Sequence, residues 1–339
     1  MRLIWMFLLC AIPALLSAQT RDLTIYWVDV EGGAATLIVS PSGQSLLVDT
    51  GNPTPDDRDA KRIFSVAQQA GLKQIDNLVI THFHMDHVGG VAALSKLIPI
   101  ERFYDHGDSI ETRNPRDKQD WENYLAASKG KRTIVKPGDR IPLRGVPVEV
   151  LTADAKQIDK PLKGGGPNPL CSSAQDKPAD HTENQRSVSL LVTYGKFKFL
   201  DMGDLTWDRE MAIACPVNRI GAVTLFQTTH HGFFHDFSGA PALVWAIKPQ
   251  TVVVNNGPRK GLQPSAWETI SKIPDVEGIW QVHLSLASDK SHNTSEQMIA
   301  NLEASAECKG NYLKASVARD GKYTITNSRN GYSKSYTAR

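Results

Sequence analysis

Four side chains that can bind a metal ion fall within six residues of this chain. The segment from Thr81 to Gly90 reads THFHMDHVGG, and its candidate ligands are His82, His84, Asp86 and His87. Neutral imidazoles and a carboxylate together suit a borderline cation such as zinc. If the chain leaves a strand here, alternate side chains point to the same face, so we expect His82, His84 and Asp86 to converge. His87 then faces a second metal.

The residues on either side agree with a ligand-bearing loop at a strand end. Leu78-Val79-Ile80 has the pattern of a buried strand, Gly89-Gly90 permits a close turn, and the run from Val91 to Ile98 predicts a short helix. A histidine-rich surface loop is the alternative. Such a loop has no need of a strand, ligands, glycines and a helix in this order, so we favour the metal site.

Apolar periodicity predicts the elements that position this segment. The residues from Asp59 to Gly71 predict a helix with Ile63, Val66 and Ala67 on one face. Strands are expected over 23–28, 35–39, 45–49, 102–104, 133–135, 146–151, 187–194 and 197–200, and another helix over 117–128. The segment from Thr152 to Asn184 is long for a loop, which is typical of a functional lid or a disordered connection.

Three further segments extend the metal motif into a known pattern. Val28 to Gly51 contains two expected strands and ends in D-T-G, a later strand ends in Gly203-Asp204, and another ends in His230-His231-Gly232. With H-x-H-x-D-H, these segments resemble the metallo-β-lactamase superfamily. Their order looks most like the branch that includes the metallohydrolase domain of the DNA-uptake channel ComEC. The resemblance covers roughly Asp22 to Val282 and implies an αββα sandwich, an α+β fold of two mixed sheets flanked by helices.

The resemblance also implies a two-metal site, filled by Zn²⁺ or alternatively Mn²⁺. Asp204 is expected to bridge the metals, although an aspartate after glycine at a strand end could simply cap the next helix. The family pattern favours His231 over His230 as the last ligand, because it directly precedes glycine. His230 would then orient a neighbour or contact substrate. Phe233 departs from the pattern, which has serine there, and suggests a more apolar wall.

The third ligand of the first metal is left open by the sequence. Di-zinc members of the superfamily have a histidine there, and His181 is the imidazole available nearby. ComEC-like members carry N-x-x-S instead, which Asn184 to Ser187 matches. His181 either completes the first metal shell or is a solvated loop residue, and Asn184 would contact substrate.

Other polar residues are assigned supporting roles. Asp49 of the D-T-G segment is expected to hydrogen-bond a ligand histidine and fix its tautomer. Arg259, on a loop after the expected strand from Thr251 to Val254, could pair with an anionic substrate. Asp86 and Asp204 are the expected catalytic carboxylates, because both would hold the nucleophile at the metals.

The N-terminus has the pattern of an export signal. Arg2 precedes an apolar run from Leu3 to Leu16, and Ser17-Ala18 is a small-residue end, although Leu16 makes the cleavage site imperfect and an uncleaved anchor is the alternative. We therefore expect a signal peptide over 1–18, a hydrolase domain over 19–285 and a C-terminal extension over 286–339 that packs on it. No later segment is apolar enough for a membrane span, so we expect a periplasmic or extracellular protein.

Cysteines and net charge add limits on compartment and partners. Outside the leader stand Cys171, Cys215 and Cys308, which allow one disulfide in an oxidising compartment, without indicating the pair. The formal net charge of +2 offers no support for a nucleic-acid partner, although a local basic face remains compatible with it. The sequence does not indicate an oligomeric state.

Metal chemistry indicates a hydrolase. A metal-bound hydroxide attacks an electrophilic phosphorus or carbonyl, and the motif order favours phosphodiesters. A hydrolase of small cyclic amides, lactones or thioesters is the alternative, favoured by the near-neutral charge and by Phe233-Phe234. A non-catalytic binding module is the third hypothesis, but such a module would not need so complete a ligand set.

Overall fold

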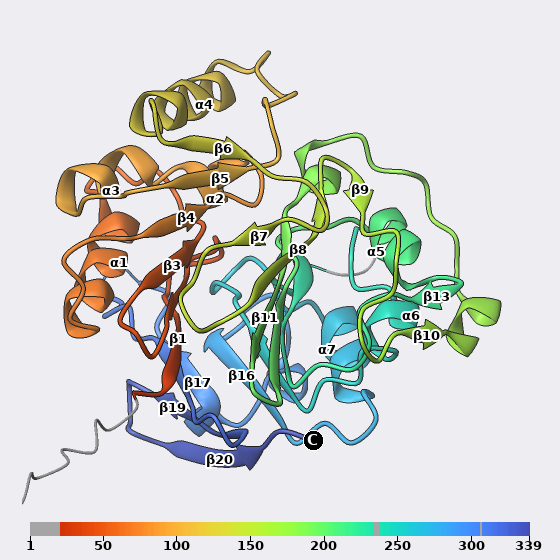
Figure 1. Ribbon diagram of the computed structural model, residues 1–339. Helices are drawn as coiled ribbons and strands as arrows, with labels where there is room; N and C mark the ends of the chain where they lie inside the picture. The colour runs from red at the N-terminus through yellow and green to blue at the C-terminus, as the bar shows by residue number, and fades with distance from the viewer. Residues whose placement is uncertain (1–20, 234–236, 306) are drawn as a thin grey trace, which may run out of the picture.

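In a computed structural model, which describes residues 21–233, 237–305 and 307–339, two large mixed sheets pack face to face (Figure 1). The expected signal peptide over 1–18 lies outside the described residues. The first sheet has, in spatial order, β20 (Ser333–Thr337), β19 (Lys322–Asn327), β18 (Leu313–Val317), β1 (Leu23–Trp27), β2 (Thr36–Val39), β3 (Ser45–Val48), β4 (Asn77–Val79), β5 (Phe103–Asp105) and β6 (Arg132–Ile134).

The second sheet carries the other half of the chain. Its spatial order is β17 (Ile299–Asn301), β16 (Gly278–His283), β15 (Thr251–Val254), β14 (Leu225–Gln227), β12 (Phe197–Asp201), β11 (Ser189–Tyr194), β8 (Val148–Ala153) and β7 (Arg140–Ile141), with β9 (Lys156–Gln157) beside β8. The strands from β12 to β17 pair in parallel, so their carboxyl ends lie at one edge of the sheet. Loops that follow these strands therefore meet.

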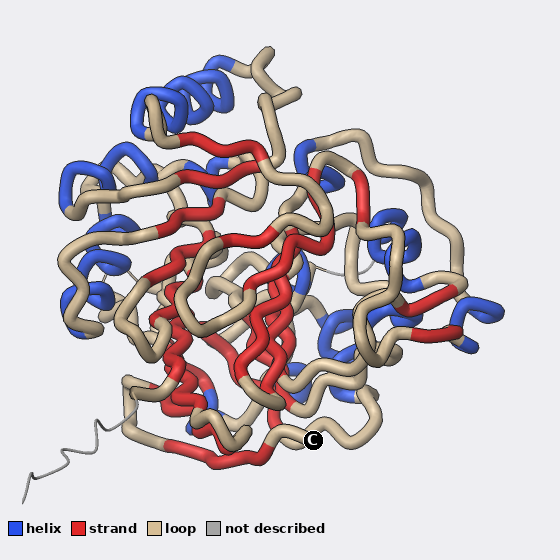
Figure 2. The backbone as a smooth tube through the Cα atoms, viewed as in Figure 1, coloured by secondary structure: helices blue, strands red, loops and turns tan. Residues whose placement is uncertain are grey.

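Helices cover the outer face of each sheet (Figure 2). On the first sheet these are α1 (Arg58–Gln69), α2 (Met85–Val88), α3 (Val91–Leu97) and α4 (Pro115–Ala127), and on the second sheet α5 (Trp207–Ala214), α6 (Pro241–Val244) and α7 (Pro264–Ser271). Short 3₁₀ turns are η1 (Pro169–Ser173), η2 (Glu183–Arg186), η3 (Thr229–Gly232), η4 (Lys290–His292) and η5 (Glu296–Met298).

Strand alternation produces three apolar layers. In β1, Leu23, Ile25 and Trp27 point into the core between the sheets, whereas Tyr26 points to the core beneath the helices. The third core lies between the second sheet and its helices and contains Phe226. Two faces of each sheet are thus buried, as an αββα sandwich requires. The predicted fold class is confirmed.

Helix boundaries follow local capping. α1 buries the predicted face with Ile63, Val66 and Ala67, and Gly71 follows its end with a φ of 76°. α4 begins two residues earlier than the sequence predicts, because the Asn114 side chain accepts a hydrogen bond from Arg116 N and the following proline suits a first helical turn.

The residues after Ser285 extend both sheets. β17 pairs in parallel with β16 of the second sheet, and β18 pairs antiparallel with β1 of the first. β19 and β20 continue that sheet as a meander. The connection between β17 and β18 therefore passes from one sheet to the other, and the sequence analysis assigned no elements to it.

The long segment from Thr152 to Asn184 is built of short pieces. β9 pairs with β8, β10 (Gly166–Pro167) pairs with β13 (Val217–Asn218), and η1 is joined to the end of α5 by a disulfide between Cys171 and Cys215. Cys308 is a free, buried cysteine. No helix in the described part of the chain is both long and apolar enough to cross a membrane.

Candidate metal centre

The H-x-H-x-D-H segment bends into a helical turn halfway along. After β4 the chain stays extended to His84, which has φ −70° and ψ 147° and caps α2. Asp86 and His87 therefore lie on the same helical turn. The sequence predicts that His82, His84 and Asp86 converge by strand alternation. In the structure Asp86 instead lies with His87, because both are on a helical turn, where side chains do not alternate every two residues.

The two glycines after this turn are needed for space. A Cβ on Gly89 would lie 2.2 Å from Pro53 Cδ, and one on Gly90 would lie 2.1 Å from Thr50 O. The loop after β3 therefore crosses directly over α2, and Thr50 N donates to His87 O at 2.7 Å. This crossing holds the ligand turn against the D-T-G segment.

Four buried ligand groups meet at one point: Asp86, His87, Asp204 and His231, called here the central cluster. One ligand atom from each lies within 4.8 Å of the others. His87 Nε2 is 3.2 Å from both His231 Nε2 and Asp204 Oδ1, and His231 Nε2 is 3.3 Å from Asp86 Oδ2. Three separate loops contribute, after β4, β12 and β14.

Strained backbone brings both late histidines to Asp204. His230 and His231 have φ of 52° and 56°, the left-handed region that side chains rarely adopt. His231 Nε2 lies 3.3 Å from Asp204 Oδ1, and His230 Nε2 lies 3.4 Å from Asp204 Oδ2. The turn η3 lets each histidine face a different oxygen of Asp204, and His231, which the family pattern favours as the last ligand, is the one that joins the central cluster.

Polar neighbours hold the ligand rings of the central cluster. Asp49 Oδ2 lies 2.7 Å from His87 Nδ1, and the same carboxylate accepts hydrogen bonds from Thr81 N at 2.7 Å and Thr81 Oγ1 at 2.8 Å. The Asn255 side-chain amide lies 3.1 Å from His231 Nδ1. With Nδ1 engaged, the Nε2 atom of each ring is directed at the shared point, as is typical of metal-binding histidines.

The electrostatics of the central cluster call for a cation. Burial opposes charge on Asp204, but His231, His87 and His230 outweigh it and hold the pKa of Asp204 well below its usual value. Burial also opposes charge on His87, yet Asp204, Asp49 and Asp86 raise its pKa well above the usual value. The buried carboxylates thus draw a proton onto His87, at the place where a divalent ion would neutralise the same charge. The donor set fits such an ion.

The other half of the signature has fewer donors. His82 Nε2 lies 3.0 Å from His84 Nδ1, and His84 Nε2 lies 3.0 Å from Glu111 Oε2. Burial, followed by the neighbouring His87, lowers the pKa of His82 well below its usual value, which favours the neutral ring that a metal needs. Ser187 Oγ is 3.5 Å from His82 Nδ1.

Asn184 supplies an unsatisfied oxygen beside this half. Its Oδ1 is buried and has no hydrogen-bond partner among the described residues, whereas the adjacent Glu183 contacts the signature: Glu183 Oε2 accepts a hydrogen bond from Phe83 N at 3.3 Å. His181 is exposed. A buried polar atom without a partner calls for an explanation, and a bound ligand is one such explanation.

Lys260, Glu111 and Glu183 are site residues that the sequence analysis missed. Lys260 Nζ contacts Asp86 Oδ2, whereas its neighbour Arg259, singled out from the sequence, is exposed. The sequence shows the basic pair Arg259-Lys260 on a loop after a strand, but it does not indicate which of the two side chains turns inward. Glu183 is fully buried and holds His106 at 2.9 Å and Ile110 N at 2.6 Å, so it fixes the loop that carries Glu111.

An aromatic wall lies beside His230. The rings of Phe233 and Phe237 lie 5.5 Å and 6.1 Å from the His230 ring and 5.3 Å from each other. Phe237 is 46% exposed. His235 and Asp236 lie outside the described residues. The wall gives the site an apolar side, and Lys260 gives it a charged one.

Comparison with known proteins identifies the fold. Residues 28–174, which include the H-x-H-x-D-H segment, match the Metallo-beta-lactamase superfamily. The chain has the metallo-β-lactamase fold. Of the central cluster, Asp204 and His231 lie beyond the matched residues, on the second sheet. The superfamily match supports a hydrolase with divalent metal ions.

Two curated proteins extend the similarity of this metallo-β-lactamase fold chain. Recombination protein 2 of Haemophilus influenzae is 25% identical over 231 residues, 68% of this chain and 24% of that protein. ComE operon protein 3 of Bacillus subtilis is 24% identical over 268 residues, 74% of this chain and 30% of that protein. The resemblance to the ComEC-like branch is confirmed. The chain spans about a quarter to a third of the length of these relatives.

The chain is also similar to a solved structure and, over a shorter segment, to a third curated protein. The metallo-β-lactamase fold protein YhfI of Bacillus subtilis has a TM-score of 0.46 and 12% identity, covering 76% of this chain and 95% of that chain. Atrochrysone carboxyl ACP thioesterase of Cryptosporiopsis is 35% identical over 79 residues, 23% of this chain and 24% of that protein.

Proposed function

We propose that this protein is an exported, metal-dependent hydrolase of phosphodiesters. The observation that carries the proposal is the central cluster, in which two buried carboxylates and two buried imidazoles from three loops converge within 4.8 Å. Similarity to ComEC-like proteins supports the phosphodiester class through the shared motif order. The substrate would be a small phosphodiester or a nucleic-acid strand, with the net charge of +2 giving no support to the latter.

Zn²⁺ or Mn²⁺ would be held at two positions. Asp86, His87 and His231 would hold one ion, His82 and His84 the other, and Asp204 both. When bound, such ions lower the pKa of water and polarise the electrophilic centre. Asp49 and the amide of Asn255 keep the two buried rings oriented throughout, so that the chain loses no free energy in reorganising them during the reaction.

Lys260 would bind the anionic part of the substrate. Its ammonium group contacts Asp86 and is 40% exposed, so one side faces the cluster and the other faces solvent. A phosphate oxygen that reaches the cluster from outside would meet this cation first. Asn184, whose Oδ1 is buried and unpaired, would contact substrate from the side of His82 and His84.

The disulfide supports export. Disulfides persist in oxidising compartments, and Cys171 is bonded to Cys215. Cells that express the whole chain should contain mature protein beginning near Gln19 outside the cytoplasm. Full-length protein retained in the cytoplasm would contradict this part of the proposal.

A substrate panel tests the reaction. Metal-loaded mature protein would be assayed on bis(p-nitrophenyl) phosphate, single-stranded and double-stranded DNA, a chromogenic cephalosporin, an acyl-homoserine lactone and an acyl thioester. We expect turnover of the phosphodiesters. Lys260→Met should raise KM at least about tenfold with little change in kcat, because Lys260 contributes binding. Arg259→Met, the adjacent exposed cation, is the matched control and should change KM by less than about twofold.

A thioester or lactone hydrolase is the second candidate. The aromatic pair Phe233 and Phe237 beside His230 favours a substrate with an apolar group, and the match to an acyl-carrier thioesterase over 79 residues agrees with it. Turnover of the thioester or lactone with inert phosphodiesters would establish this candidate and reject the first. In that case Phe237→Ser should reduce kcat/KM, because the wall would bind the acyl group.

A further inference from the structure

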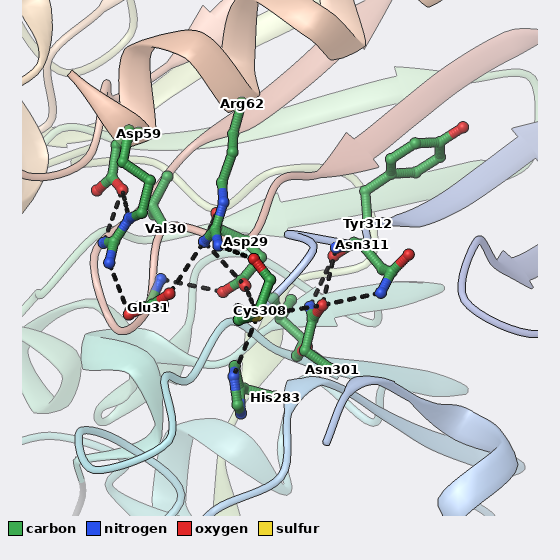
Figure 3. A network of polar contacts seen from close by, with 12 residues as sticks. Asp29, Val30, Glu31, Asp59, Arg62, His283, Asn301, Cys308, Asn311 and Tyr312 are labelled. Carbon is green, nitrogen blue, oxygen red and sulfur yellow. Dashed lines mark hydrogen bonds and ion pairs between the residues drawn. The ribbon is translucent and has the colours of Figure 1, made fainter. Parts of the chain in front are cut away.

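A second group of metal-binding side chains lies away from the central cluster. Asp29, His283 and Cys308, called here the seam cluster, are all buried and present one ligand atom each within 4.8 Å of the others. Figure 3 shows them with their polar neighbours. Cys308 Sγ lies 3.4 Å from Asp29 Oδ2 and 3.9 Å from His283 Nε2. A carboxylate, an imidazole and a thiol at these separations form a donor set for zinc.

The spacing matches a tetrahedral metal site. Zinc binds sulfur at roughly 2.3 Å and nitrogen or oxygen at roughly 2.0–2.2 Å, so ligand atoms at tetrahedral corners lie roughly 3.3–3.8 Å apart. The distances from the sulfur, 3.4 Å to Asp29 and 3.9 Å to His283, fall at or near this interval. Asn301 Oδ1 lies 3.7 Å from Sγ but already accepts hydrogen bonds from Asn311 N and Nδ2, so Asp29, His283 and Cys308 remain as the ligands.

The imidazole is held in the tautomer that a metal requires. His283 Nδ1 lies 3.2 Å from the carbonyl oxygen of Leu284 and donates to it. The Nε2 atom is then unprotonated and faces the sulfur. A ring whose second nitrogen donates to a backbone carbonyl is the usual arrangement of a metal-binding histidine.

Arg62 is the group that opposes a cation here. Its guanidinium lies 3.1 Å from Asp29 Oδ2, but it is also 3.2 Å from Glu31 Oε1 and donates to Cys308 O at 2.7 Å. Asp29, Glu31 and a Cys308 thiolate carry three negative charges, and Arg62 with a divalent ion carries three positive ones. Bound metal therefore leaves the buried group neutral, with Arg62 still paired.

We propose that Asp29, His283 and Cys308 bind a structural divalent metal ion, of the zinc type, that joins the two sheets. Asp29 follows β1 of the first sheet, His283 ends β16 of the second, and Cys308 lies on the connection from β17 to β18 that crosses between them. Metal binding replaces the thiol proton, which is released to solvent. The sulfur ligand suits zinc, and three protein ligands from both sheets would fix the crossing.

The loop after β1 links this site to the central cluster. Asp29 begins the loop, and at its other end Ala34 N donates to Asp86 O at 3.0 Å, while Gly33 packs against the same carbonyl. A metal at Asp29 would therefore also restrain the backbone that contacts a ligand of the central cluster, without touching substrate.

Cobalt substitution tests the proposal, because a sulfur-to-cobalt charge-transfer band reports only on a thiolate ligand. The central cluster offers no sulfur, and Cys171 and Cys215 are joined in the disulfide. Oxidised protein that begins at Gln19 and therefore lacks Cys10, stripped of metal and loaded with Co²⁺, should show the band. Cys308→Ser should abolish it and remove about one metal equivalent per chain, and the Cys171→Ser/Cys215→Ser double variant, as matched control, should keep it.

Two further variants guard against a folding defect. Asp29→Asn and His283→Gln keep the size of their side chains and should weaken Co²⁺ affinity at this site by at least about tenfold. A visible cobalt spectrum without the charge-transfer band in the wild-type protein would overturn the proposal and leave Cys308 as a thiol that donates to Asp29. Persistence of the band in Cys308→Ser would overturn it equally.

Discussion

The central cluster and the seam cluster are both buried groups of metal-binding side chains, yet they differ in donors and access. The central cluster has two carboxylates and two imidazoles, and its neighbours His84 and Lys260 are partly exposed, with side chains 27% and 40% accessible. The seam cluster has one sulfur and lies among backbone carbonyls and Arg62. Hard oxygen donors beside an accessible rim suit catalysis, whereas a closed site with sulfur suits structure.

The two clusters also differ in how the fold brings them together. Strand ends on both sheets deliver the central ligands, and dedicated side chains such as Asp49 orient them. The seam ligands are oriented by main-chain groups, and Arg62 competes for Asp29. In the central cluster, where ligands would be exchanged, side chains orient the metal-binding rings. In the seam cluster, which joins the two sheets, a main-chain carbonyl orients the imidazole.

The largest expected effect separates the two clusters outright. Asp204→Asn removes the carboxylate that lies between His87, His230 and His231, so activity should fall by more than about 100-fold, beyond what loss of a supporting group costs. Metal content of the central cluster should fall with it. Steady-state kinetics and metal analysis measure both.

The cobalt–sulfur band of the seam cluster should survive in Asp204→Asn, because the two clusters share no residue. A band lost together with activity would show that the clusters do not bind metal independently. Cys308→Ser provides the reciprocal comparison and should retain phosphodiesterase activity.

Asp49→Asn should reduce metal affinity by about 10–100-fold, because the amide no longer anchors His87 as a carboxylate does. Competition with a chelating dye measures the affinity. Asp56→Asn, at an exposed position on the loop between β3 and α1, is the control and should bind metal as the wild type does. Unchanged affinity in Asp49→Asn would mean that packing alone orients His87.

The next effect tests which residue completes the half of the site at His82 and His84. Asn184→Ala should lower kcat/KM by about tenfold and leave the metal content unchanged, because its buried Oδ1 is proposed to meet substrate. His181→Ala, exposed on the preceding segment, should have no effect on either measurement. Metal loss in His181→Ala would instead establish His181 as a ligand and reverse this assignment.

The smallest expected effect concerns the contribution of the buried Glu210 on α5 to the stability of the fold. Burial raises the pKa of Glu210 to about 8, and its Oε2 accepts a hydrogen bond from Ala240 N. Because the folded pKa is above the unfolded value, the protonated form stabilises the fold below pH 4.5, and this contribution is lost as the pH rises through 8.

Glu210→Gln should therefore gain stability relative to the wild type as the pH rises from 6 to 9, by on the order of 1–3 kcal/mol. Denaturant unfolding at several pH values measures the difference. Glu268→Gln, which makes the same change at an exposed position on α7, is the control. A difference between wild type and Glu210→Gln that does not change with pH would show that Glu210 is charged in the folded protein at all these values.

Much of the fold and of the central cluster follows from local sequence. Strand alternation and helix periodicity placed β1, β4 and α1, because a buried face repeats at the period of its own element. The H-x-H-x-D-H spacing indicated four candidate ligands: Asp86 and His87 lie in the central cluster, and His82 and His84 lie beside it. Their chemistry is local: residue type and short spacing select the ion before the chain folds.

Tertiary structure decided what depends on distant segments. The inward turn of Lys260, the pairing of Cys171 with Cys215, and the left-handed backbone at His230 and His231 each come from packing between elements. The seam cluster joins residues separated by 279 positions in sequence, Asp29 and Cys308, and no metal-ligand spacing in the sequence links its members. Short spacing constrains which side chains share a loop, but only the closing of two sheets on each other fixes which loops meet.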